Sequence, residues 1–169
     1  MEGINDIIPN LELAQICWVV KDIQVAADFF SISLAVPGFP EPELVRAQDL
    51  GMTYKGEVVD GEWLTTQAYN GVTFVELVQP LSGQSMFHDY LDQHPAGGAQ
   101  YFAYRLSVSD FEEVVGKFQA KGYEIISEVD HPIARMEFFD TYKTIGAVTE
   151  IMGITPEGWE AVEQMKNGN

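Results

Sequence analysis

The sequence predicts an α+β fold in which two βαβββ modules form one cupped, eight-stranded sheet, with a helix at the C-terminal end. Two observations support this prediction. The order strand, helix and three strands occurs twice along the 169 residues. Each half alone is too small to bury enough apolar surface, and its sheet would have exposed edges. We therefore expect one domain, with module one at 11–80, a linker helix at 82–96, module two at 99–153 and a C-terminal helix at 156–167.

Module one opens on an apolar run, from Leu11 to Val20, that is rich in the residues that strands prefer. Asp22 is a good helix cap, and the apolar residues behind it recur at intervals of three and four, which predicts a helix. Pro37 ends this helix and opens a loop over 37–49. Three strand-like runs follow at 51–59, 62–69 and 72–79, with the turn pairs Asp60-Gly61 and Asn70-Gly71 between them.

Module two repeats this order, beginning with a strand over 100–108. Ser109 or Asp110 can cap the helix that follows, and Gly122 is a good C-terminal stop. Three more strand-like runs cover 123–129, 134–142 and 147–152. Thr155 and Pro156 then combine a cap with a proline at the first helical position, which predicts the C-terminal helix.

The charge of the chain limits its partners. Nine Lys and Arg residues face 26 Asp and Glu residues, so the net charge is −17. A nucleic-acid backbone or an anionic membrane surface would be repelled by this field. We expect a small-molecule ligand, with no nucleic acid and no membrane among the partners.

The single cysteine, Cys17, lies in an apolar run, where a buried and inert thiol is expected. One cysteine cannot form an internal disulfide or a cysteine-rich zinc site. The first six residues lack the basic start and the apolar core of a signal peptide. These features predict a cytoplasmic protein.

Four segments of the chain resemble the vicinal-oxygen-chelate superfamily, which includes glyoxalases, methylmalonyl-CoA epimerases, extradiol dioxygenases and bleomycin-resistance proteins. Residues 15–23, with 26–30 behind them, are similar to the opening strand and helix of that family. Residues 75–81 resemble the strand that closes the first module in the epimerase branch. Residues 90–98 resemble the linker helix of that branch and the glycines that follow it. Residues 148–153 resemble the last strand. The resemblance implies the cupped fold and a homodimer.

In metal-using members of the family, four side chains point into the cup, and the matching positions here are Gln15, Glu76, Tyr101 and Glu150. A register two residues later would put Ala103 in place of Tyr101, and both positions face the same side of the sheet. Neither residue is a good ligand for a divalent ion. We therefore expect no cofactor. If a metal is present, the resemblance implies Gln15, Glu76 and Glu150 as its ligands.

A glutamate in an apolar pocket beside a second glutamate has a raised pKa, which suits proton abstraction next to a carbonyl group. By resemblance to the epimerase and glyoxalase branches, Glu150 would be this base. Glu76 would raise the pKa of Glu150 or share a proton with it. Tyr101 would donate to the enolate oxygen, since a phenol can replace a metal as electrophile, and Gln15 would fix the carbonyl group.

The sequence thus favours an enzyme, a glyoxalase-like lyase or isomerase that enolises a small and largely hydrophobic carbonyl compound. Arg135 can pair with a ligand carboxylate, while Phe74 and Trp63 are candidates for the wall of the cup. Two alternatives stay open. The polar cluster can be a hydrogen-bonded floor in a non-catalytic, sequestering protein of the bleomycin-resistance type. A metal-dependent dioxygenase is the weaker alternative, because the matching positions lack histidine.

Overall fold

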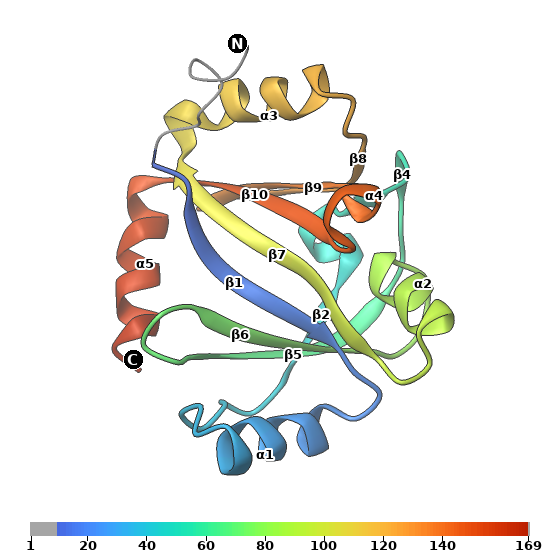
Figure 1. The fold of residues 1–169 in the computed structure, drawn as a ribbon, viewed down its shortest axis with the longest axis vertical. Helices are drawn as coiled ribbons and strands as arrows, with labels where there is room; N and C mark the ends of the chain where they lie inside the picture. Colours follow the sequence, from blue (N-terminus) through green and yellow to red (C-terminus); the bar gives the residue numbers. More distant parts are fainter. Residues whose placement is uncertain (1–9, 169) are drawn as a thin grey trace.

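The computed structural model describes residues 10–168, and Figure 1 shows their arrangement. The N-terminal residues used to predict a cytoplasmic location lie outside this range. Module one contains β1 (Glu12–Val19), α1 (Ile23–Ser33), β2 (Glu43–Arg46), the 3-10 helix η1 (Ala47–Leu50), β3 (Thr53–Tyr54), β4 (Glu57–Val58), β5 (Glu62–Tyr69) and β6 (Phe74–Pro80). The linker helix is α2 (Met86–Gln93).

Module two contains β7 (Gly98–Ser107), the 3-10 helix η2 (Val108–Asp110), α3 (Phe111–Ala120), β8 (Ile125–His131), β9 (Ala134–Phe139), α4 (Tyr142–Ile145) and β10 (Val148–Ile154). The C-terminal helix is α5 (Pro156–Lys166), and the side chain of Thr155 caps it as predicted. Asp22 likewise caps α1 by accepting from the backbone N–H of Val25. None of the helices in residues 10–168 is long and apolar enough to cross a bilayer.

All strands join one curved sheet, in the order β2-β5-β6-β1-β7-β10-β9-β8-β3-β4. The α+β class and the cupped sheet are confirmed, but the sheet has ten strands and not the predicted eight. The chain from Pro37 to Asp49 was expected to be a loop, yet it contains β2, which pairs with β5. Backbone pairing with β5 therefore makes a strand of a segment whose sequence indicates a loop.

The run over 51–59 is not one strand, because the backbone turns sharply in its middle. Lys55 and Gly56 have left-handed φ angles of 52° and 80°, and they separate β3 from β4. This hairpin pairs with β8 of module two instead of with its own module. Asp60-Gly61 accordingly closes no hairpin, whereas Asn70-Gly71 connects the antiparallel strands β5 and β6 as predicted.

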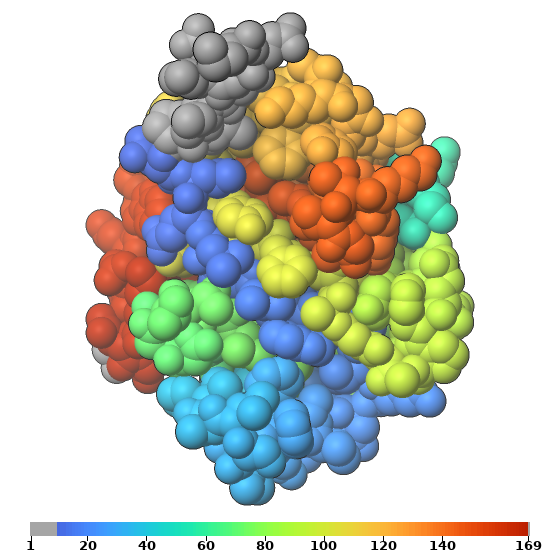
Figure 2. All heavy atoms as spheres, in the orientation of Figure 1, coloured from blue at the N-terminus to red at the C-terminus, as the bar shows by residue number. Residues whose placement is uncertain are grey.

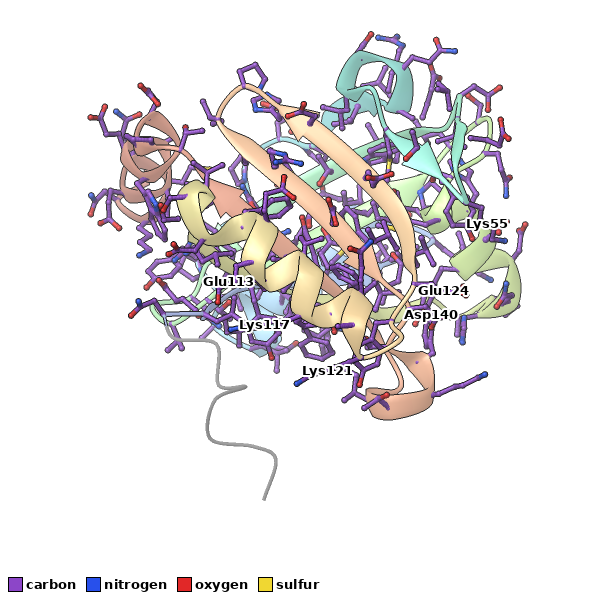
Figure 3. All side chains as sticks on the ribbon, turned by 90° about the horizontal axis from the view of Figure 1, so that it is seen from above. Lys55, Glu113, Lys117, Lys121, Glu124 and Asp140 are labelled. Atoms are coloured by element: carbon purple, nitrogen blue, oxygen red, sulfur yellow. The ribbon has the colours of Figure 1, made fainter. Side chains whose placement is uncertain are left out.

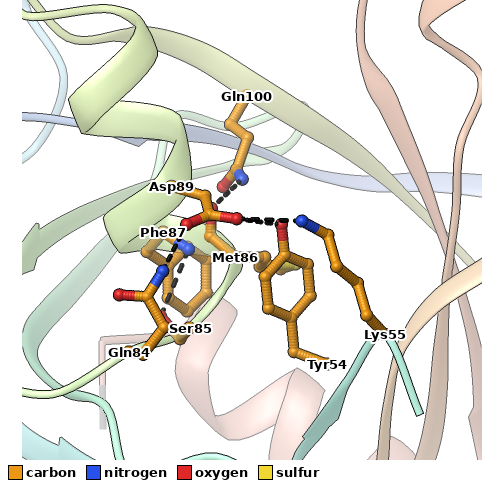
Figure 4. A network of polar contacts seen from close by, with 8 residues as sticks. All are labelled: Tyr54, Lys55, Gln84, Ser85, Met86, Phe87, Asp89 and Gln100. Carbon is orange, nitrogen blue, oxygen red and sulfur yellow. Dashed lines mark hydrogen bonds and ion pairs between the residues drawn. The ribbon is translucent and has the colours of Figure 1, made fainter. Parts of the chain in front are cut away.

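The two ends of the sheet are joined through the chain itself. β2 lies at one end and β3 with β4 at the other, and only η1 and a short turn separate them in sequence. Polar contacts hold the hairpin in place against α2, as Figure 4 shows. Asp89 of α2 accepts hydrogen bonds from the Tyr54 hydroxyl (2.7 Å) and the Lys55 ammonium group (3.1 Å). This connection closes one side of the cup.

The helices α1 and α3 pack on the outer face of the sheet, one against each module. Ile23 and Ala27 of α1 share a hydrophobic cluster with Val75 and Leu77. Phe111 of α3 is a buried member of the corresponding hydrophobic cluster of module two. The opposite face of α3 is charged, with Glu113, Lys117 and Lys121 along it in Figure 3. Figure 2 shows that strand side chains of β1 and β7 reach the surface between the two helices.

The modules meet at the antiparallel pair β1–β7, and the register of this pair relates their sequences. Gln15 lies opposite Ala103, and Cys17 lies opposite Tyr101. A two-fold rotation that superposes module one on module two, about an axis through the centre of this pair, places Gln15 on Tyr101 and Cys17 on Ala103. The closing strands agree with this match, since Cys17 is the partner of Glu76, and Ala103 is the partner of Glu150.

Candidate active site

The concave side of the sheet encloses a cavity of about 320 Å³. Strands of both modules form its floor, the segment from β2 to Met52 forms part of its wall, and α5 lies against it. Gly158, Ala161, Val162 and Met165 are the residues of α5 that line it. Most lining side chains are apolar, including Met52, Trp63, Phe74, Phe87, Val129, Met136, Phe138 and Met152. The charged groups among its described lining residues are Glu76, Arg105 and Glu150.

The four residues matched to the family site are all in this cavity, and three of them are hydrogen-bonded to one another. The Gln15 side-chain amide donates to Glu76 Oε2 (2.7 Å) and contacts the Tyr101 hydroxyl oxygen at 3.1 Å. The Tyr101 hydroxyl donates to the same Glu76 oxygen. Thr65, which sequence reasoning missed, donates to Glu76 Oε1 (3.1 Å). The carboxylate of Glu76 is thus surrounded by donors.

Glu150 is in a different environment. Its side chain is only 1% exposed, and its Oε2 is buried with no hydrogen-bond partner among the described residues. Burial first, and then the neighbouring charge of Glu76, raises the pKa of Glu150 well above its ordinary value. An ionised carboxylate in this position would be unsolvated and unpaired, so the neutral form is favoured.

The two carboxyl groups differ in how far their surroundings stabilise the charged form. Burial also raises the pKa of Glu76, but the hydrogen bonds from Tyr101 and Thr65 oppose this effect by stabilising the charged form. No such donors reach the buried oxygen of Glu150. Of the two carboxyl groups, Glu76 is therefore the better stabilised in its charged form, and Glu150 is the one that more readily keeps a proton.

The sheet register also clarifies which residue of β7 corresponds to Gln15. Tyr101 is the match, while Ala103 corresponds to Cys17. The Tyr101 side chain is 3% exposed, and burial raises its pKa well above the ordinary value, with smaller contributions from Cys17 and the two glutamates. Tyr101 is therefore a protonated hydrogen-bond donor in the cavity. Burial likewise raises the pKa of the Cys17 thiol, which agrees with an inert cysteine.

The residues proposed to bind the substrate divide into two groups. Trp63 and Phe74 line the cavity, and Trp63 packs edge-on against Phe87. Arg135 does not join them, which corrects the prediction. Its guanidinium pairs with Glu112 and lies 4.8 Å from the centre of the Phe111 ring, against α3 on the outer face of the sheet. Alternation along β9 alone could not tell which face of that strand is concave.

Arg105 is the arginine that lines the cavity, and sequence reasoning missed it. The signal was present, because residues 101, 103 and 105 face the same side of a strand. The irregularity between Leu13 and Gln15 places the extra residue on β1. β7 pairs with β10 without a break from Tyr101 to Ser107, so this alternation holds through Arg105.

A divalent metal is the group that the resemblance implies for this site, and the residues do not fit it. Glu76 already accepts hydrogen bonds from three side chains, and Tyr101 and Gln15 turn donors toward it. Among the four matched residues, Glu150 is the one that keeps a buried oxygen without a partner. Within residues 10–168, no three His, Cys, Asp or Glu side chains are grouped so that they could hold a metal ion. No step of the reaction proposed below passes through a metal.

A second, more open cavity of about 700 Å³ adjoins the first. The two share Thr65, Gln67, Phe74, Glu76 and Met165, so the outer cavity leads to the carboxylate of Glu76. Its rim carries Glu41 and Glu43, with Lys166 as the basic residue among its described lining. This acidic rim disfavours a polyanionic ligand.

Comparison with known proteins supports the fold. A methylmalonyl-CoA epimerase from Mycobacterium tuberculosis is 18% identical, with 86% of this chain and 89% of that chain covered and a TM-score of 0.64. A hypothetical protein from Bacillus halodurans is 19% identical, with coverages of 85% and 94% and a TM-score of 0.62. A variant of the methylmalonyl-CoA epimerase from Streptomyces coelicolor, in complex with 2-nitronate-propionyl-CoA, is 16% identical, with coverages of 85% and 94% and a TM-score of 0.58.

These similarities establish that the chain has the vicinal-oxygen-chelate fold. Identities of this size carry the fold alone. No protein-family model matches the sequence, and a search of curated proteins finds no match. The activity must therefore be argued from the site.

Proposed function

We propose that this protein is a lyase or isomerase that enolises a small, largely hydrophobic carbonyl compound without a metal. The observation that carries the proposal is the pair Glu76 and Glu150, which lie in one mostly apolar cavity and differ in their hydrogen-bond donors. Such a pair can both accept and return a proton near neutral pH. Structural neighbours that are epimerases support an isomerase-like reaction.

The hydrogen bonds of the ligand-free site suggest how the base is released. A substrate carbonyl oxygen that enters beside Gln15 and Tyr101 competes with Glu76 for their donors. Once Glu76 loses these donors its pKa rises, and it takes the proton from Glu150. Glu150 is then an unpaired carboxylate, and therefore a strong base, inside an apolar cavity.

The reaction then has two proton-transfer steps, removal of the α-proton and its return. The Glu150 carboxylate removes the proton from the carbon next to the carbonyl group. The electron pair of the C–H bond forms the C=C bond of the enolate, and the π pair of the carbonyl group moves onto its oxygen. The enolate oxygen is stabilised by hydrogen bonds from Tyr101 and Gln15. If Glu150 returns the proton to the same face of the carbon, the substrate is regenerated. If Glu76 delivers its proton to the opposite face, the epimer forms and the starting protonation of the two acids is restored. In a lyase reaction, the enolate re-forms the carbonyl group and expels a β-substituent, which takes the proton from Glu150.

Deuterium exchange tests this proposal directly. The purified protein in D₂O should exchange the α-proton of carbonyl compounds that it binds, as followed by proton NMR. The Glu150→Gln variant keeps the size of the side chain and should slow exchange by about 10²-fold or more. Arg135→Gln, outside the cavity, is the matched control and should exchange at the wild-type rate.

The alternative is a protein that binds its ligand without turnover. It is favoured by one observation, namely that Gln15, Tyr101, Thr65 and Glu76 satisfy one another in the ligand-free site. Binding of carbonyl compounds with no exchange, together with equal binding by Glu150→Gln, would decide for this alternative. The homodimer and the cytoplasmic location remain predictions; a native mass of twice 18.8 kDa would support the dimer.

A further inference from the structure

Arg105 is buried beside the carboxyl pair, on the cavity side of β7. Its side chain is 3% exposed, although arginine is almost never fully buried unless it is paired. The guanidinium Nη2 donates to Glu12 Oε1 at 2.6 Å, and the group lies 5.5 Å from the centre of the Trp159 ring of α5. The arginine is therefore held in a fixed orientation between β1 and α5.

One donor of this arginine is unused. Arg105 Nε is buried and has no hydrogen-bond partner among the described residues. Glu12 is half-exposed and engages the guanidinium at a different nitrogen. A buried, charged donor without a partner is costly, and a role confined to packing would not require it. Because Arg105 also lines the cavity, its guanidinium has donor capacity left for an acceptor on a ligand.

The position of Arg105 relates it to the proposed chemistry. Ala103 is the register partner of Glu150, and Arg105 is the partner of Met152. Arg105 thus lies two residues, or roughly 7 Å, further along the sheet than the Ala103–Glu150 pair. An arginine and a glutamate side chain can bridge this separation and contact two groups of one small molecule.

The other charges of the cavity define the ligand further. Arg105 is the one basic group among the described lining residues, against the two glutamates. A single guanidinium matches a single carboxylate, and it can bind one through two parallel hydrogen bonds. The acidic rim of the outer cavity, with Glu41 and Glu43, disfavours the phosphates of a coenzyme arm.

We propose that the ligand is a small, free oxo acid whose carboxylate binds Arg105 and whose carbonyl group lies at Gln15 and Tyr101. Its apolar tail packs against the aromatic and methionine side chains of the cavity. The choice of an oxo acid rests on the proposed function, whereas the carboxylate anchor rests on Arg105 alone. This assigns Arg105 as the residue that sets specificity for an anionic substrate.

Calorimetric titration tests the anchor with defined probes. The probes are straight-chain and branched 2-oxo and 3-oxo acids of four to eight carbons, with 4-methyl-2-oxopentanoate as the first, and the methyl ester of each. The wild-type protein should bind at least one acid about tenfold or more tightly than its ester, because the ester cannot form the charge-assisted hydrogen bonds. If no acid of the series binds, or if acid and ester bind alike, the proposal is wrong.

Variants show whether Arg105 is responsible. Arg105→Gln should reduce the preference for acid over ester to about onefold, and Arg105→Lys, which keeps a charge opposite Glu12, should retain only part of it. Arg135→Gln is the matched control and should keep the full preference. Thermal melting of each variant establishes folding, and the acid-to-ester ratio cancels any loss of folded protein. A folded Arg105→Gln variant with the wild-type ratio would overturn the assignment.

The two proposals fail in different ways. Acid-selective binding that depends on Arg105, with no α-proton exchange, would leave the anchor and remove the enolisation. Exchange that depends on Glu150 but is equal for acids and esters would leave the enolisation and remove the anchor.

Discussion

At the scale of single residues, the surroundings of a carboxyl group decide its charge. Glu76, Glu150 and Glu137 all lie in the sheet, and burial raises the pKa of each. Only Glu76 is compensated by several hydrogen-bond donors. Glu150 has none at its buried oxygen, and Glu137 faces Glu128 directly across the β8–β9 pair. The chemistry proposed for the site depends on this difference between two chemically identical side chains.

Glu137, which does not line the cavity, should make the free energy of unfolding depend on pH. Its pKa is raised to about 7, chiefly by burial and then by Glu128, while Arg135 opposes the shift. Because this pKa is higher in the folded state, the folded protein holds the extra proton between about pH 4.5 and 7, and the free energy of unfolding falls as pH rises through this window. In Glu137→Gln this contribution, up to about 1.4 kcal/mol per pH unit, should be absent.

Urea unfolding at several pH values between 4.5 and 7 measures this contribution. The exposed Glu160→Gln variant is the control and should follow the wild-type slope, to which Glu76 and Glu150 also contribute. An unchanged slope in Glu137→Gln would contradict the assigned protonation of Glu137.

At the scale of elements, α5 completes the cavity by approaching the sheet closely. Gly158 makes this approach possible, because a Cβ at this position would lie 2.3 Å from the carbonyl oxygen of Ile133 and 2.8 Å from Cγ2 of Ile154. Further along the helix, the Gln67 amide contacts Met165 Sδ at 3.3 Å, which links α5 to β5 of module one. The helix predicted from its capping residues is thus also a wall of the site.

Two glycine-to-alanine substitutions should have opposite effects on stability. Gly158→Ala should destabilise the protein by about 1–3 kcal/mol, because the carbonyl group of Ile133 is part of the backbone and cannot yield easily. Gly116→Ala in α3 should stabilise it by about 0.5–1 kcal/mol, because open space surrounds this position and alanine favours the helix.

Chemical denaturation of both glycine variants provides the comparison. Stabilisation of the protein by Gly158→Ala would mean that α5 does not pack as closely as described. The same variant should also weaken ligand binding, since a displaced α5 opens the cavity.

At the scale of the whole molecule, the net charge of −17 opposes the compact state. Surface carboxylates repel one another on the folded protein more than in the expanded chain. Apart from Arg105–Glu12, in which the arginine is buried, the described ion pairs, such as Glu113–Lys117 and Arg46–Glu62, are largely exposed, and such pairs contribute little to stability.

Salt should therefore stabilise this protein. Screening of the repulsion predicts a melting temperature that rises by on the order of a few degrees between about 0.05 and 0.5 M NaCl. The dependence should be shallower at pH 5, where part of the carboxylates are protonated. A melting temperature that falls with added salt at pH 7 would contradict the dominance of self-repulsion.

Features that depend on local signals and periodicity could be predicted before the fold was known. These are the repeated module order, the caps Asp22 and Thr155, and the Asn70-Gly71 hairpin. The sequence also predicted that Gln15, Glu76, Tyr101 and Glu150 face one hollow, since alternation fixes the face of a strand and the resemblance supplied the register.

Features that depend on contacts between distant segments could not be predicted in this way. The hairpin β3–β4 pairs with module two, and β2 forms where the sequence indicates a loop, because backbone pairing with a neighbouring strand outweighs weak local preference. Which arginine reaches the cavity depends on which face of each strand is concave. For this reason Arg105, and not the predicted Arg135, lines the cavity. Three donors stabilise the charged form of Glu76, and they come together only when β1, β5, β6 and β7 lie side by side.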